Sequence, residues 1–118
     1  MSSTDRELLE SAAKAAGVEL LYRSIGGAVY TERRGLACAS GKRRWWNPLI
    51  DDGDAFRLSV KLDMRVCVGR VDFGDFETWE DSIDMPEADV RADPTAATRR
   101  AIVRAAAAMV ERPVLGAA

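Results

Sequence analysis

The chain has 118 residues, of which 47% are hydrophobic and 31% are charged, and its net charge is −2. This length and composition fit one domain with a substantial hydrophobic core, and they exclude intrinsic disorder as the overall state. The chain contains no histidine, which excludes Ser-His-Asp and Cys-His catalysis and zinc catalysis that depends on imidazole.

The sequence carries no signal for a membrane or for secretion. No run of about 18 apolar residues is present, and residues 1–5 lack the basic and apolar regions of a secretory signal. We therefore expect a cytoplasmic protein. Cys38 and Cys67 have no histidine or CxxC partner, so they are predicted to be free thiols that pack as small buried hydrophobes.

The N-terminal third predicts one helix followed by strands. Thr4 and Glu7 have the spacing of a capping box, and apolar residues then recur at helical spacing as far as Gly17. These features predict a helix over residues 4–16. Alternation and glycine turns then predict strands over residues 18–22, 28–31 and 36–39, the last pairing with the second.

The middle of the chain predicts a helix and a strand pair. Pro48 and the following aspartates favour a helix over residues 52–63. Residues 65–73 alternate in polarity, with a break in parity that a bulge at Gly69 would explain. A turn at residues 73–75 and a returning strand over 77–83 complete this hairpin, and a short extended segment is predicted to end at Val90.

The C-terminal helix has the clearest start signal. Asp93 is the predicted N-cap, and Pro94 occupies the first helical position, where its missing N–H is not needed. Pro113 is predicted to end the helix. The stripe formed by Ile102, Val103, Ala106, Met109 and Val110 is predicted to face the core, while Arg99, Arg100 and Arg104 face solvent.

Together these elements predict an α+β fold. Three helices and one mainly antiparallel sheet would form a layered α/β/α sandwich. Residues 1–112 are predicted to form a single domain, and residues 113–118 a flexible C-terminal tail.

Two segments support a family resemblance. Residues 46–62 (WNPLIDDGDAFRLSVKL) and 93–106 (DPTAATRRAIVRAA) resemble the phage ABA sandwich family, which consists of small proteins encoded in bacteriophages and prophages. The resemblance implies a helix–sheet–helix layered fold, a phage or prophage origin and a location in the bacterial host cell. It brings no catalytic residue with it.

A basic and aromatic stretch is the best candidate for a binding surface. Aromatic side chains stack on unpaired bases and cations neutralise phosphates. Because neighbouring side chains alternate along an extended segment, we expect Trp45 to be exposed and Trp46 to pack over the helix at 52–63. The candidate surface consists of Arg33, Arg34, Lys42, Arg43, Arg44 and Trp45.

Three carboxylates before the second helix suggest either helix capping or a cation site. Asp51, Asp52 and Asp54 offer the oxygen ligands that divalent cations prefer. A calcium loop with Gly53 at position six would place Ser59 at position twelve, where glutamate is required. Capping is therefore the favoured interpretation.

A glycine-rich segment resembles a phosphate loop but lacks its requirements. Five residues separate Gly35 from Gly41, where four are needed, and Arg43 replaces the hydroxyl residue. We expect neither a cofactor nor a nucleotide here.

We expect a non-enzymatic phage or prophage accessory protein that binds a protein partner or itself. A nucleic-acid-binding module that uses residues 42–46 is the alternative. A metal-dependent hydrolase built on the three aspartates is a third hypothesis. The acidic stretch at 72–89 is predicted to be a solvated hairpin, with docking of a basic partner as its alternative.

Overall fold

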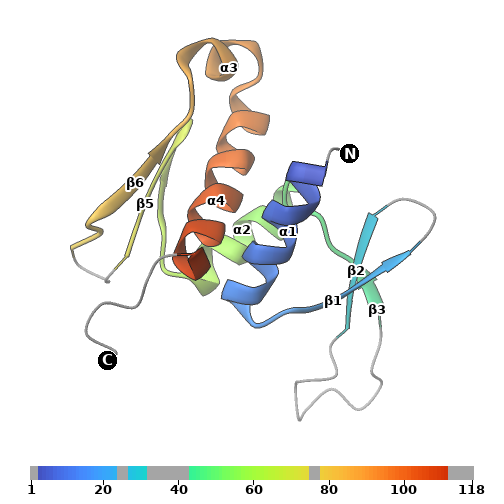
Figure 1. Ribbon diagram of the computed structural model, residues 1–118. Helices are drawn as coiled ribbons and strands as arrows, with labels where there is room; N and C mark the ends of the chain where they lie inside the picture. The colour runs from blue at the N-terminus through green and yellow to red at the C-terminus, as the bar shows by residue number, and fades with distance from the viewer. Residues whose placement is uncertain (1–2, 24–26, 32–42, 75–77, 112–118) are drawn as a thin grey trace.

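The computed structural model of the protein describes residues 3–23, 27–31, 43–74 and 78–111. These residues form four helices and six strands (Figure 1). In chain order the elements are α1 (Ser3–Ala16), β1 (Glu19–Arg23), β2 (Gly27–Thr31), β3 (Arg43–Trp45), α2 (Asp52–Lys61), β4 (Arg65–Cys67), β5 (Arg70–Phe73), β6 (Asp81–Asp84), α3 (Glu87–Ala92) and α4 (Pro94–Glu111).

The long helix α4 is the centre of the fold. It packs against α1, α2 and the β4–β5–β6 sheet, and α1 lies along its length (Figure 1). The contact between α1 and α4 is close because both helices present small residues there. Leu9 and Val103 are fully buried in this core, and they are surrounded by the buried alanines Ala12, Ala13, Ala101, Ala105 and Ala106.

The strands divide into two antiparallel three-stranded sheets. In the β1–β2–β3 sheet, Leu21 lies opposite Val29, and Val29 lies opposite Trp45. In the β4–β5–β6 sheet, Val71 is the central residue, with Val66 on one side and Ile83 on the other. The inner face of this second sheet covers α4, because Val71 is buried against it in the same core.

The α+β class and the antiparallel pairing are confirmed. There are four helices among the described residues instead of three, and the strands form two sheets instead of one. The predicted extended segment ending at Val90 is wrong, because residues 87–92 form α3. Val90 is partly buried and packs against the core from this short helix.

The predicted bulge at Gly69 is also wrong. Residues 68 and 69 form a turn that separates β4 from β5, so the break in parity marks the end of a strand. Gly69 has φ +70°, which the second central position of a type II turn requires. The returning strand begins at Asp81 instead of residue 77, since Trp79 adopts φ +40° ahead of it.

Elements with strong local start signals lie where they were predicted. The helices predicted over residues 4–16 and 52–63 are α1 and α2. α4 begins at Pro94, and the Asp93 carboxylate accepts a hydrogen bond from the Ala96 N–H at 3.0 Å. The predicted strand over 36–39, the helix stop at Pro113 and the tail at 113–118 lie outside the described residues.

None of the helices in the described part of the chain combines the length and the hydrophobicity that a membrane span requires.

Candidate binding groove

The carboxylates at the start of α2 are engaged by the protein itself. Asp51 is the N-cap and accepts a hydrogen bond from the Asp54 N–H at 2.8 Å. The buried Asp54 carboxylate accepts from the Asn47 N–H at 2.9 Å and from Arg57 at 2.8 Å. These bonds fold residues 47–54 into a compact entry to the helix, which is the capping role predicted for them.

Asp52 connects this entry to α4. It pairs with Arg99 at 2.6 Å, and Arg99 also donates to the Leu49 carbonyl at 2.8 Å. The Arg99 side chain is only 18% exposed, and the partly buried Arg100 pairs with Asp5 at 2.6 Å. The prediction that Arg99 and Arg100 face solvent is therefore wrong, since both tie α4 to other elements.

The described residues contain no group of three or more Asp, Glu, Cys or His side chains arranged to hold a metal ion. In the acidic entry to α2, the Asp51 carboxylate points to a backbone N–H while the Asp52 carboxylate points to an arginine.

The two adjacent tryptophans differ in burial as predicted. Trp45 is 61% exposed at the end of β3, whereas Trp46 is buried in the core. Trp46 borders a small cavity together with Leu58 of α2, so it packs at that helix. Arg43 and Arg44 belong to β3, an edge strand. Arg33, Arg34 and Lys42, the rest of the candidate surface, lie outside the described residues.

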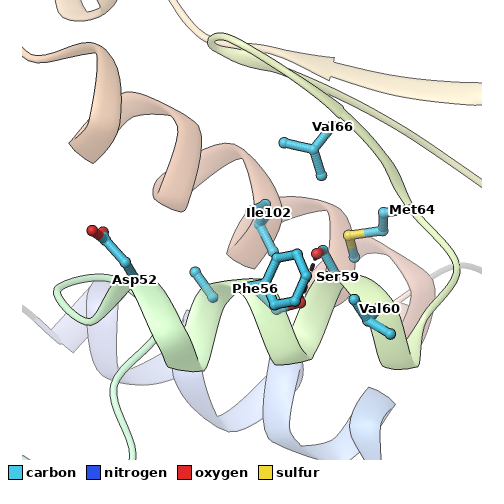
Figure 2. Close-up of a pocket in the computed structure, with 8 residues that line it drawn as sticks. Asp52, Phe56, Ser59, Val60, Met64, Val66 and Ile102 are labelled. Atoms are coloured by element: carbon cyan, nitrogen blue, oxygen red, sulfur yellow. Dashed lines mark hydrogen bonds between the residues drawn. The ribbon is translucent and has the colours of Figure 1, made fainter.

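An apolar groove lies between α2 and β4. Its volume is about 300 Å³. Figure 2 shows Phe56 and Val60 on α2, Ile102 on α4, and Val66 on β4 around the same space. Phe56 is 67% exposed, Val60 58% and Val66 39%. The full lining is Asp52, Ala55, Phe56, Ser59, Val60, Met64, Val66 and Ile102.

The polar groups in this lining have partners within the chain. The Ser59 hydroxyl donates to the Phe56 carbonyl at 2.7 Å (Figure 2), and the Asp52 carboxylate is paired with Arg99. Because these polar groups already bond within the chain, the surface that the groove presents to a partner is mainly apolar. Burial of such a surface is favourable in proportion to its area.

Sequence reasoning missed this groove, although a signal was present. Ala55 and Leu58 face the core, while Phe56 and Val60, four residues apart, form a second apolar stripe that faces outward. A helix that is apolar on two sides needs two partners. Nothing in the sequence placed β4 next to this second stripe.

The outer face of the second sheet carries a network of ion pairs. Arg65 on β4 donates to the buried Asp72 carboxylate at 2.9 and 2.7 Å, and Arg70 donates to the other oxygen at 3.2 Å. Arg70 also pairs with Asp84 on β6 at 3.2 Å. The Arg65 guanidinium lies 5.0 Å from the centre of the Trp79 ring. This network spans all three strands and fixes the position of Arg65.

The hydrogen bonds from Arg65 hold the pKa of the Asp72 carboxyl below its ordinary value of 3.8, with burial opposing this shift and the charge of Arg70 adding to it. The carboxylate therefore contributes stability above pH 3.8, and this contribution is lost as the pH falls through the lowered pKa. We expect the urea midpoint of the wild type to exceed that of Asp72→Asn at pH 6. The difference should shrink below pH 3.8, and a constant difference would contradict this account.

Cys67 is exposed at the end of β4, so the prediction that it is buried is wrong. It lies opposite Arg70 on the outer face of the sheet. Cys38 lies outside the described residues.

Comparisons with protein-family models, with curated proteins and with solved structures find no match for the chain.

Proposed function

We propose that this protein is a non-catalytic phage or prophage accessory protein that binds a protein partner through the groove between α2 and β4. The observation that carries this proposal is the gathering of Phe56, Val60 and Val66, all large, apolar and exposed, around one groove. Contiguous exposed apolar surface on a globular protein marks an interaction site. The phage origin rests on the resemblance of residues 46–62 and 93–106.

The groove suits binding better than catalysis. Its walls are apolar, and its hydroxyl and carboxylate already bond within the chain. A partner that inserts apolar side chains would bury Phe56 and Val60, and aromatic anchors in such pockets carry much of the binding energy of an interface.

Photo-crosslinking in a bacterial host tests this proposal. With benzoylphenylalanine in place of Val60, we expect one defined protein adduct, because this position faces the groove. Adding Phe56→Asp should reduce the adduct at least tenfold, since a charge in the groove is costly to bury. Arg104, exposed on α4, is the control position. The same adducts from positions 60 and 104, or none from position 60, would contradict the proposal.

Nucleic-acid binding is the second candidate function, and the exposure of Trp45 on the edge strand β3 favours it. An exposed tryptophan beside basic residues can stack on an unpaired base. The same experiment distinguishes the two candidates when the crosslinker replaces Trp45. A nuclease-sensitive adduct from position 45, with none from position 60, would favour nucleic acid as the ligand.

A further inference from the structure

The strand β4 is an open edge of the second sheet. Among the strands that the structure describes, β4 pairs with β5 alone, and all three residues of β4 are exposed. An edge strand offers unpaired backbone groups to another chain.

The register of β4 identifies which backbone groups face outward. Cys67 and Arg70 pair across the two-residue turn, and the residues that flank such a turn form a hydrogen-bonded pair. Val66 and Val71 are the next pair, so the Val66 N–H and C=O point away from β5. Within the described part of the chain, no other backbone group bonds to Val66.

Helix α2 lies across the groove from this open edge. It packs on α4 and makes no comparable contact with the second sheet, and the groove separates it from β4 (Figure 2). None of the described strands therefore packs against the outward stripe of Phe56 and Val60. One added strand would both pair with Val66 and fill the groove.

On the outer face of the sheet, the residue nearest this open edge is a cation, Arg65. Arg65 has a side chain that is 58% exposed. Its Nε and one terminal nitrogen, Nη2, donate to Asp72, while its Nη1 has no bond to any described residue. The guanidinium is held in place by Asp72 and Trp79, so an incoming carboxylate would meet a cation whose orientation is already fixed.

We propose that the partner enters as an extended segment that adds a fourth, antiparallel strand to β4. Its side chains alternate, with apolar residues in the groove beside Val66 and an acidic residue on the outer face beside Arg65. This is β-strand addition, in which backbone bonds provide affinity and alternate side chains provide specificity. The inference rests on the proposed function, because it names the chemistry of the partner for the same groove.

The test uses the full chain and a synthetic probe, acetyl-Lys-Thr-Val-Glu-Val-Glu-Val-Thr-Lys-amide. In an antiparallel strand, the residues whose side chains enter the groove carry the N–H groups that face β4. N-methylation of the central Val therefore removes a pairing donor. N-methylation of a neighbouring Glu places its methyl group at the far edge and serves as the matched control.

In NMR titrations we expect the unmodified probe to shift the Val66 amide and the Val60 methyl signals. We expect the N-methyl-Val probe to bind about five to ten times more weakly, which corresponds to the loss of one hydrogen bond. The N-methyl-Glu probe should bind like the unmodified one. Lysines in place of both glutamates should weaken binding, most strongly at low salt.

Three outcomes would overturn this inference. One is the absence of any shift at Val66 with millimolar probe, and another is equal binding by both N-methylated probes. The third is a Val66 shift that depends on protein concentration without peptide, which would make a second copy of the chain the occupant. A crosslink at position 60 combined with a silent Val66 would refute strand addition while leaving the proposed groove function intact.

Discussion

Replacement of Gly69 by alanine should lower the free energy of unfolding by about 2–4 kcal/mol. Gly69 has φ +70°, and an added Cβ would lie 2.5 Å from Cγ2 of Val90. Val90 is β-branched and packed against the core from α3, so its side chain has few alternative rotamers. Both backbone strain and steric overlap therefore contribute to the expected loss.

The turn cannot move away from this overlap without losing other contacts. The Gly69 N–H donates to the Thr98 hydroxyl at 2.8 Å, and its carbonyl accepts from the Met85 N–H at 2.9 Å. These bonds hold the turn to α4 and to the end of β6. Urea unfolding followed by circular dichroism measures the change.

Gly53→Ala is the matched control for this substitution. An added Cβ there lies 3.2 Å from the end of the flexible Arg57 side chain and 3.3 Å from the Asp51 carboxylate. Gly53 is inside helix α2, where alanine is favoured. We expect a change within about 0.5 kcal/mol, since helix propensity offsets the mild crowding. In Gly69→Ala, the further change Val90→Ala should relieve the overlap but retain the backbone strain. Equal stability of the two glycine variants would refute the turn geometry.

The same turn shows why part of the fold could not be predicted from the sequence. The break in polarity at Gly69 was visible in the sequence. The contact that holds this turn in place comes from Thr98, which lies 29 residues away, so no local pattern could show it. The start of α4 is signalled by two adjacent residues, Asp93 and Pro94, and it was predicted correctly.

The candidate site divides in the same way. The burial of Trp46 and the exposure of Trp45 follow from alternation along one strand, so the sequence was sufficient to predict them. The groove depends on Val66 lying across from Phe56, and no local pattern relates a helix face to a distant strand. Arg99 was assigned to solvent for the same reason, because its partners at residues 49 and 52 lie on another element.

The three aspartates before α2 should differ strongly in their contributions to stability. Asp54→Ala should cost about 2–3 kcal/mol, because it leaves the Asn47 N–H without its acceptor in a partly buried position. Asp51→Ala removes the N-cap and should cost about 1 kcal/mol. Asp52→Ala breaks an ion pair in which the aspartate is largely exposed, and should cost less than about 1 kcal/mol.

This ranking also separates capping from cation binding. In a cation site the three carboxylates would act together, and added Mg²⁺ or Ca²⁺ would raise the unfolding midpoint by mass action. In the capping arrangement each carboxylate accepts from a different donor. The stability lost in each alanine variant therefore follows the burial of that donor, and divalent ions have no specific effect. Urea unfolding of the three variants, with and without 5 mM of either ion (on the order of the weaker calcium sites), distinguishes the two. A midpoint that rises with the ion in the wild type but not in Asp52→Ala would refute the capping account, because that variant leaves both helix-entry bonds of Asp51 and Asp54 intact.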